Sequence, residues 1–557
     1  RRQVQEVSQV VEDGYQGSAL AGQQVVVVTG GDLTALGSTI HGRERVDLVA
    51  GGDLTVRAAT GTTHSETTRQ LSQTDSPAWS DAGPSQAWQQ THEIRTTTTL
   101  HGGLIESGGD LNLEAGGDLT LTAATLQASS HARLAATGDI RLDSLTGEAG
   151  LTSERETNAG WSGLGLFNAG SSGAGSNGFG PNGKETLQQL ETHQHGSQIK
   201  AGGDLAVIAG GDARLLGADL RAEGALAVVG QNVEIAALKD RLSEDRLTQA
   251  GKTRTTTLSE HESLVGGTVS GGGEVTVLAL GEAGRIDLAG VHVASDTGAT
   301  SLGAQGDIAI GTVTTEHHQF SETRSKKSGF LSSKKTHTIE EGWASVAEGS
   351  LIEGATVFVD SGQHLSVIGS GIVADGSVAL FADGDIDILA AESQASGYDH
   401  KQVTRSGLFS GGGLSITLGK QQTTTDHHHT STQAVQSQVG SLEGDVIIES
   451  GGRYRETGSQ VTAEGDVGIN AHRIEIAEAR EINHDELETR YRQSGLSLSL
   501  GGPLVDFGQT ATSLTQAARR TDSERMQILA ITGIGLSAYN NASELGAAVD
   551  AIKSGNP

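Results

Sequence analysis

Hydrophobic and polar residues alternate in short runs along most of the chain. After a Gly-Asp turn, two apolar residues typically follow with one polar residue between them. Successive side chains of a β-strand point to opposite faces, so this period of two predicts short strands with one buried and one solvated face. The pairs expected to face inward are Leu54/Val56, Leu119/Leu121, Ile140/Leu142, Ile386/Ile388, Val446/Ile448 and Val467/Ile469.

The turns before these strands recur at a fixed interval, which is the mark of a repeat architecture. The interval is about 21 residues, which separates Asp32 from Asp53 and His364 from Asp385. In such a turn we expect glycine to supply a positive φ and the acidic side chain to cap a neighbouring backbone N–H. The predicted structural turn residues are Asp32, Asp53, Asp118, Asp139, Asp204, Asp385, Asp445 and Asp466.

Short strands that return at a fixed interval describe the coils of a solenoid. A coil of this length cannot hold a pair of helices, and the local period of two opposes helix formation. The sequence therefore predicts an all-β fold, a right-handed parallel β-helix with about 21 residues per coil. Its handedness follows the general rule for crossovers between parallel strands.

A longer period of 80 to 90 residues carries insertions. In three copies a Glu-Thr pair, at Glu156, Glu322 and Glu488, is followed six residues later by Ser-Gly and an apolar residue. An outgoing arm, a glycine-rich tip and a Thr/His-rich return arm predict a long β-hairpin that protrudes from the coil. Within a repeat region of residues 1–505, hairpins are expected near residues 61–103, 152–197, 241–265, 315–340, 398–436 and 482–505.

The last part of the chain, residues 506–557, has a different pattern. Thr521 with Glu524, and Asn541 with Glu544, have the spacing of helix-capping boxes, so we expect a short helical segment that begins another domain. No apolar h-region of a signal peptide opens the sequence, and the chain starts inside the repeat pattern. We therefore interpret it as a fragment of a longer protein.

Composition narrows the possible partners. The formal net charge of −30 opposes binding to phosphate backbones, so nucleic acid is not expected as the main partner. One basic stretch runs from Arg324 to Lys335, and with Glu322 and Glu340 nearby we interpret it as a solvated strand or turn rather than a binding patch. The absence of cysteine excludes disulfides, thiolate metal sites and cysteine nucleophiles.

Candidate chemistry is sparse. The "GGGLSITLG" stretch has no following helix and no Lys-Ser/Thr pair, so a phosphate-binding loop is not expected. His193/His195 and His427/His429 can each share a strand face, but a zinc site usually needs three or four ligands. No carboxylate pair suggests glycoside hydrolysis. We therefore expect no catalytic residues, no metal, no cofactor and no enzymatic activity in this chain.

The hairpins are the functional candidates. Leu414, Ile416 and Leu418 alternate with polar residues, and a second set near residue 498 repeats the pattern. This apolar face either packs on the coils or on the next hairpin, or it re-pairs in or on a membrane. The candidate membrane- or partner-facing residues are Leu408, Phe409, Leu414, Ile416, Leu418, Leu496, Leu498 and Leu500.

Taken together, "GGDLT", "AGGDL" and "SGLFSGGGLSITLG" resemble the haemagglutinin-repeat exoproteins of Gram-negative two-partner secretion. The chain is similar to filamentous haemagglutinin and to contact-dependent growth-inhibition effectors over roughly residues 14–505. The hairpin-bearing repeat resembles their second, C-terminal haemagglutinin-repeat region, which precedes a helical pretoxin segment. The family's "VENN" boundary is absent from the chain.

The resemblance implies a non-enzymatic segment of a secreted, cell-surface exoprotein, with retention in the periplasm before target contact as one possible stage. Its implied role is to help deliver a C-terminal toxin across the target-cell outer membrane. The implied partners are an outer-membrane transporter of the secretion pathway and the target-cell outer membrane or envelope. Two alternatives stay open, the shaft of an adhesin and a β-helix that binds or cleaves polysaccharide.

Overall fold

The computed structural model describes residues 2–75, 85–158, 183–329, 331–410 and 415–499. The chain divides into a large unit, Arg1–Phe409 with Ile416–Ser497, and a small one, Ser410–Ser415 with Leu498–Pro557. Only strand ends of the small unit are described. The helices expected in residues 506–557 lie outside the described residues.

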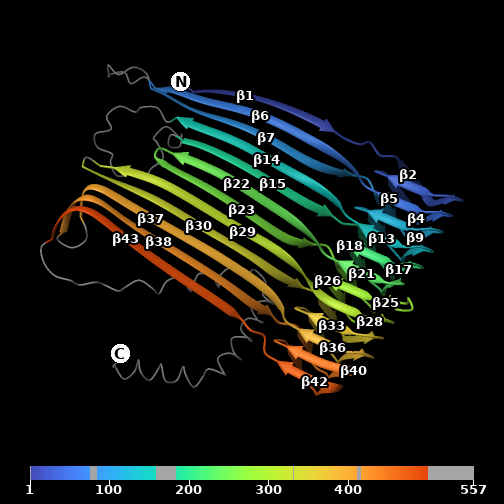
Figure 1. The fold of residues 1–557 in the computed structure, drawn as a ribbon. Coiled ribbons are helices and arrows are strands. Elements are labelled where there is room, and N and C mark those ends of the chain that lie inside the picture. Colours follow the sequence, from blue (N-terminus) through green and yellow to red (C-terminus); the bar gives the residue numbers. More distant parts are fainter. Residues whose placement is uncertain (1, 76–84, 159–182, 330, 411–414, 500–557) are drawn as a thin grey trace. The chain divides into compact units, whose positions relative to one another are not determined.

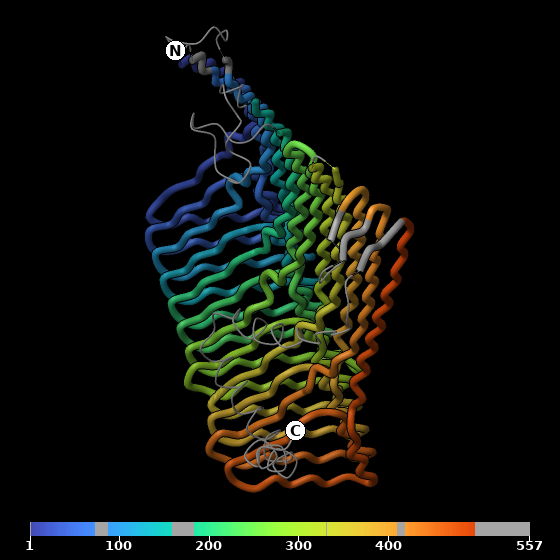
Figure 2. Tube along the Cα trace, turned by 90° about the vertical axis from the view of Figure 1, so that its left-hand side faces the viewer, coloured from blue at the N-terminus to red at the C-terminus, as the bar shows by residue number. Residues whose placement is uncertain are grey.

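The large unit is built entirely of β-strands, and no helix occurs among the described residues. This confirms the all-β class. Each coil contributes three short strands, and the equivalent strands of successive coils pair in parallel, which is consistent with a solenoid-like fold. Figure 2 shows these coils stacked in chain order from blue to red.

Each coil has the same three strand positions. The first position is occupied by the first halves of β2 (Ala19–Thr29) and β4 (Thr39–Ala50), then by β8 (Leu104–Ser107), β11 (Thr125–Ala128), β16 (Gln198–Ala201), β19 (Asp219–Ala222), β24 (Thr268–Gly271), β27 (His292–Ser295), β31 (Leu351–Gly354), β34 (Gly371–Ala374), β39 (Gln438–Ser441) and β41 (Gln460–Ala463). The second position holds the second halves of β2 and β4, then β9 (Asp110–Ala115), β12 (Ala132–Ala136), β17 (Leu205–Ala209), β20 (Leu226–Gly230), β25 (Val275–Ala279), β28 (Ala299–Ala304), β32 (Thr356–Ser361), β35 (Val378–Ala382), β40 (Val446–Thr457) and β42 (Val467–Ala477).

The third position leads to the hairpins. It holds β3 (Leu33–Leu36), β5 (Leu54–Arg57), β10 (Leu119–Thr122), β13 (Ile140–Asp143), β18 (Ala213–Leu216), β21 (Val233–Ala236), β26 (Ile286–Ala289), the start of β29 (Ile308–Ser328), β33 (Leu365–Ile368), β36 (Ile386–Leu389) and the ends of β40 and β42. Where no hairpin intervenes, residues that pair between successive coils are 21 positions apart in the sequence, as in Leu119↔Ile140 and Leu111↔Ala132.

The core is a continuous row of apolar side chains inside the coils. The alternation seen in the sequence puts Leu119, Leu121, Ile386 and Ile388 at 0% exposure. The pair Val467/Ile469 is the exception: Val467 has 45% of its surface exposed, and Ile469 is only partly buried. The pair lies in β42, the second strand of the last described coil, so no described coil covers it from the far side.

The hairpin arms form one antiparallel side sheet that extends away from the coils (Figure 1). A hairpin follows every second coil and always leaves after the third strand position. The arms, in order across the sheet, are β1 (Arg2–Asp13), β6 (Ala59–Asp75), β7 (Ser85–His101), β14 (Leu145–Asn158), β15 (Gly183–His195), β22 (Leu238–Ala250), β23 (Thr253–Val265), β29, β30 (Ser332–Gly349), β37 (Ala391–Ser410), β38 (Ser415–Val435) and β43 (Ile482–Ser499).

Most arms begin closer to the coil than the sequence pattern suggested. The second arm pair spans 145–195 rather than 152–197, and the fourth spans 312–349 rather than 315–340. β29 even runs without a break from its coil strand into its hairpin arm. The reason is that the two arms of each hairpin stay paired with each other down to its base, as in Leu145↔His195 and Thr312↔Gly349, where the sequence shows no apolar alternation.

Candidate functional site

Acidic residues at the coil turns form hydrogen-bonded ladders that join one coil to the next. The Asp53 N–H donates to Asp32 Oδ1 at 2.9 Å, and the Asp118 N–H donates to Asp53 Oδ1 at 2.8 Å. The series continues through Asp139 and Asp212 at 2.9 Å each. The sequence suggested that each carboxylate caps an N–H within its own turn, whereas the recipient is the equivalent residue of the next coil.

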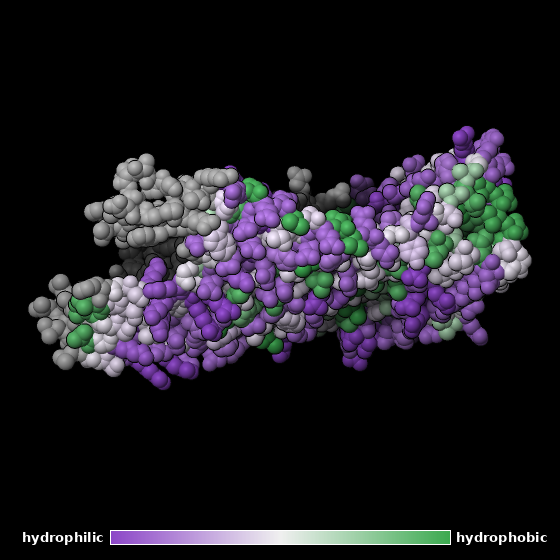
Figure 3. Space-filling view, turned by 90° about the horizontal axis from the view of Figure 1, so that it is seen from above, coloured by the Kyte–Doolittle hydropathy of each residue, from purple (hydrophilic) through white to green (hydrophobic). Residues whose placement is uncertain are grey.

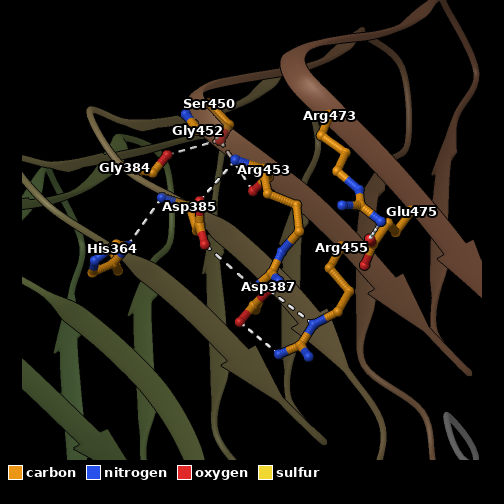
Figure 4. Close-up of polar contacts among 10 residues, drawn as sticks. All are labelled: His364, Gly384, Asp385, Asp387, Ser450, Gly452, Arg453, Arg455, Arg473 and Glu475. Atoms are coloured by element: carbon orange, nitrogen blue, oxygen red, sulfur yellow. Dashed lines mark hydrogen bonds and ion pairs between the residues drawn. The ribbon is translucent and has the colours of Figure 1, made fainter.

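Other side chains with a hydrogen-bond acceptor can replace aspartate in the ladder. Near the C-terminal coils, the Asp385 N–H donates to His364 Nδ1 at 3.0 Å, and the Arg453 N–H donates to Asp385 Oδ1 at 2.7 Å (Figure 4). Asp387 then accepts hydrogen bonds from the Arg455 guanidinium at 3.0 and 2.7 Å. A second ladder includes Asp204, whose Oδ1 accepts from the Ala225 N–H at 2.9 Å, and Asp445 and Asp466 are linked in the same way at 2.8 Å.

The glycines of the Gly-Gly-Asp turns serve a purpose other than the expected one. None of them has a positive φ. Among the coil glycines that do, Gly37 and Gly217 lie at the corner after the third strand. A Cβ on Gly117 would lie 2.1 Å from Asp53 Oδ1, and a Cβ on Gly116 would lie 2.3 Å from the Gly51 carbonyl oxygen. Glycine is therefore needed because the previous coil, with its carboxylate, occupies the space of a side chain.

The candidate apolar residues lie toward the tips of the last hairpins. Leu408 in β37 and Leu418 in β38 are 43% and 60% exposed, so neither packs against the coils. Phe409, Ile416, Leu496 and Leu498 lie in strands β37, β38 and β43. Leu414 and Leu500 lie outside the described residues.

The strands of the side sheet are rich in polar residues, and histidine–carboxylate pairs cross between them. The closest contacts, all 2.6 Å, join His400 to Asp426, His427 to Asp485 and His337 to Glu322. Figure 3 shows the hydrophilic character of the surface as seen from above, with apolar residues gathered at the coil end. That end carries exposed side chains of β2 and β3, including Val26 and Val28.

These pairs shift the pKa values of their members. The hydrogen bond to Asp485, with a further contribution from Asp399, raises the pKa of His427. The hydrogen bond from His400 lowers the pKa of Asp426, and Tyr398 adds to this effect. The protonated histidine and the ionised carboxylate therefore stabilise each other across the sheet.

The geometry offers little for metal binding. No group of three or more His, Cys, Asp or Glu side chains able to hold a metal ion occurs among the described residues. The rings of His193 and His195 are 6.3 Å apart, and those of His427 and His429 are 5.8 Å apart. Within the part of the chain that is described, no helix has the length and apolar character needed to cross a membrane.

A model of the family described as "Hemagglutinin repeat" matches residues 5–78, 82–251, 328–426 and 418–555, which is most of the chain. The chain belongs to the haemagglutinin-repeat family. The matches include coils and hairpin arms alike, and they leave out residues 252–327, which hold β23 to β28 and most of β29.

Haemagglutinin-repeat relatives of this chain carry toxin names. "tRNA nuclease CdiA" of Escherichia coli (strain STEC_O31) is 29% identical over 372 residues, which is 66% of this chain and 11% of that protein. "tRNA nuclease CdiA" of E. coli O6:K15:H31 (strain 536 / UPEC) is 34% identical over 41% of the chain and 7% of that protein. "16S rRNA endonuclease CdiA" of Enterobacter cloacae is 29% identical over 54% of the chain and 9% of that protein.

The chain therefore spans only about a tenth of these CdiA relatives or less. No solved structure matches it. The relatives and the repeats support a segment of a CdiA-like or filamentous haemagglutinin-like exoprotein.

One feature of the haemagglutinin-repeat side sheet was missed in the sequence. The basic stretch from Arg324 to Lys335 forms two facing arms, in which Lys326 pairs with Lys335 and Lys327 pairs with Lys334. The symmetric placement of these lysines about the Ser328–Ser333 tip was the available signal, because a hairpin brings such positions into direct register.

Proposed function

We propose that this chain is a non-enzymatic delivery segment that helps a C-terminal toxin cross the target-cell outer membrane in contact-dependent growth inhibition. The curated relatives, full-length proteins named as toxins and nucleases, support this role. Since the chain covers so small a share of them, any toxic activity belongs to other sequence.

The observation that carries the proposal is the side sheet. A shaft needs only the stacked coils, which already have a continuous core. The hairpin arms instead extend from the coils as a separate sheet, and the described apolar side chains near the last tips, Leu408 and Leu418, are exposed (Figure 1). Such a sheet is available to interact with an envelope.

The proposal includes the finer description of the fold and its setting. The coils form a right-handed parallel β-helix with about 21 residues per coil. Residues 506–557 begin a helical pretoxin-like segment. The protein is exported by the outer-membrane transporter of a two-partner secretion pathway and acts at the surface of a Gram-negative cell. The target-cell outer membrane is its partner, and nucleic acid is not.

The test removes one hairpin without disturbing the coils. Where no hairpin is present, one left-handed residue closes the corner, which is Ala123 in one coil and glycine in the others described, as in Ile368-Gly369-Ser370. Replacing residues 390–436 by a single glycine reproduces this corner between Leu389 and Ser437. The matched control replaces residues 144–196, the β14/β15 hairpin, by a single glycine between Asp143 and Ser197.

In the full-length protein, binding to target cells and toxin import are measured separately. We expect the 390–436 variant to bind target cells and to lose toxin import, while the control keeps both. Unchanged import in the 390–436 variant would overturn the proposal and favour the adhesin shaft, for which the side sheet is dispensable.

A further inference from the structure

The tips of the hairpins from β23 to β37 concentrate cations on a protein with a formal net charge of −30. We name them the tip cation cluster, which consists of Lys252, Arg254, Arg324, Lys326, Lys327, Lys334, Lys335 and Arg405. Among the described residues, Arg324 is the only member whose side chain makes an ion pair, with Glu322 at 2.6 Å.

The cluster is arranged in rows across the strands. Lys327 lies opposite Lys334, which in turn lies opposite Arg405 of the next strand. Lys326 lies opposite Lys335, and its backbone N–H donates to the Lys252 carbonyl at 3.1 Å. Because adjacent residues of a strand face opposite ways, each face of the sheet carries one such row.

One row lines a groove. Lys252, Arg324, Lys326 and Lys335 border an open groove of about 420 Å³, together with His337, Thr336, Ser325, Gln402 and Thr404. Among the described residues no carboxylate is part of the lining, and Glu322 contacts the groove residues Arg324 and His337 from beside it. Cationic side chains with hydroxyl and amide neighbours are the groups that bind phosphate oxygens in proteins.

The opposed lysines lower the stability of the sheet, and no ion pair among the described residues offsets this effect. Like charges directly opposite each other destabilise a sheet. Lysines often protect an exposed sheet edge, but β29 and β30 are interior strands, with β23 on one side and β37 on the other. An anionic partner that neutralises the rows would offset this cost.

Exposed leucines lie next to the cations at the same tips. Leu331 is 62% exposed in the β29/β30 turn, and its carbonyl accepts a hydrogen bond from the Leu408 N–H at 2.9 Å. Leu408 is 43% exposed and stands three residues beyond Arg405. Apolar side chains bordered by basic ones suit the boundary between the headgroups and the acyl chains of a lipid layer.

We propose that the tip cation cluster docks the side sheet on an anionic, phosphate-bearing lipid surface, with Leu331 and Leu408 entering the headgroup layer. A lipid surface is favoured over nucleic acid because the exposed side chains of Leu331 and Leu408 accompany the cations. The inference deepens the proposed function, on which it rests, by naming the chemistry that the hairpin tips recognise.

The test measures co-sedimentation of the whole chain with vesicles. Vesicles of phosphatidylcholine alone are compared with vesicles that also contain phosphatidylglycerol. The variant changes four lysines to glutamine: Lys326→Gln, Lys327→Gln, Lys334→Gln and Lys335→Gln. The control makes the same change in net charge at exposed residues of the coil strands that make no ion pair among the described residues: Arg57→Gln, Arg133→Gln, Lys200→Gln and Arg221→Gln.

We expect binding to the anionic vesicles only, and a partition constant that falls with salt. The four-lysine variant should bind roughly 100- to 1,000-fold more weakly, since each basic residue near an anionic surface contributes about a factor of five. The coil control should bind as the unchanged chain does. A companion variant with arginine at the four lysine positions should keep binding, which separates loss of charge from misfolding.

Several results would overturn the inference. These are equal binding to both vesicle types, an equal loss in the coil control, loss of binding in the arginine variant, and tighter binding to duplex DNA than to anionic vesicles at the same salt. No toxin or target cell is involved, so the two proposals fail separately. If vesicle binding is absent but the 390–436 replacement still blocks toxin import, the delivery function stands and lipid docking falls.

Discussion

The double replacement of Gly117 and Asp53 tests why Gly-Gly-Asp recurs in the turns. A Cβ on Gly117 would lie 2.1 Å from Asp53 Oδ1, whereas its next contact, with the Gly52 carbonyl carbon, would be 3.3 Å. In Gly117→Ala the carboxylate must therefore move, and the hydrogen bond from the Asp118 N–H, 2.8 Å long, is lost. The backbone itself does not require glycine, because Gly117 has no positive φ.

The magnitudes follow from that geometry. Losing one hydrogen bond to a partly solvated carboxylate lowers the free energy of unfolding by about 1 kcal/mol, which is the expected cost of Asp53→Ala. Gly117→Ala alone should cost about 1–2 kcal/mol, because the clash adds to the lost bond. In the Asp53→Ala background the same change should be neutral or should stabilise by about 0.5 kcal/mol, since alanine restricts the unfolded chain.

Urea unfolding followed by circular dichroism gives the four free energies, and hydrogen exchange at the Asp118 amide reports the local bond. Asp53→Asn is the matched control, because its amide oxygen keeps the acceptor in place and the clash with the methyl group added by Gly117→Ala should persist. Free energies that add within about 0.3 kcal/mol would refute the reasoning, since additivity means that the two sites do not interact.

Three further predictions concern other parts of the coils and the side sheet. Ala123 has a φ of 48° at a corner where equivalent coils have glycine, so Ala123→Gly should raise the free energy of unfolding by about 1 kcal/mol, seen as a higher urea midpoint, whereas Gly217→Ala should lower it. The pKa of His427 is raised above 6.5, so its contact with Asp485 stabilises the sheet fully below about pH 6.5, and this stabilisation is lost as pH rises through the folded-state pKa. His427→Gln should therefore flatten the pH dependence of β43 hydrogen exchange above about pH 6.5, and an unchanged slope would contradict this. Tyr454 is fully buried, so Tyr454→Ala should cost about 3–5 kcal/mol by thermal or urea unfolding, and a cost below about 1 kcal/mol would show that the core closes around the gap.

The repeats made the coil strands predictable, because what defines them is local. A period of two selects the buried residues, so Leu119, Leu121, Ile386 and Ile388 were identified before any fold was known. The spacing of the turns likewise gave the register between coils that carry no insertion. Hairpins were predictable as protrusions, but their bases were not, because backbone pairing between the two arms of a hairpin leaves no apolar pattern there.

The partners of the turn residues were decided by tertiary structure. The Asp212 N–H donates to Asp139 Oδ1 across 73 residues, because a hairpin separates the two coils in sequence but not in space. No local rule could identify that donor. The same holds for the GGD glycines, whose need for space comes from a different coil rather than from their own φ.

By itself, the sequence determined the all-β class, the alternating core and the family, since each depends on residues close together in the chain or on repetition. Only the tertiary structure decided that Lys326, Lys327, Lys334 and Lys335 form opposed rows on the two faces of an interior part of the sheet. In the sequence, the stretch from Arg324 to Lys335 has the pattern of a solvated turn. Antiparallel pairing places its lysines side by side, and the resulting charge density depends on distances in space rather than along the chain.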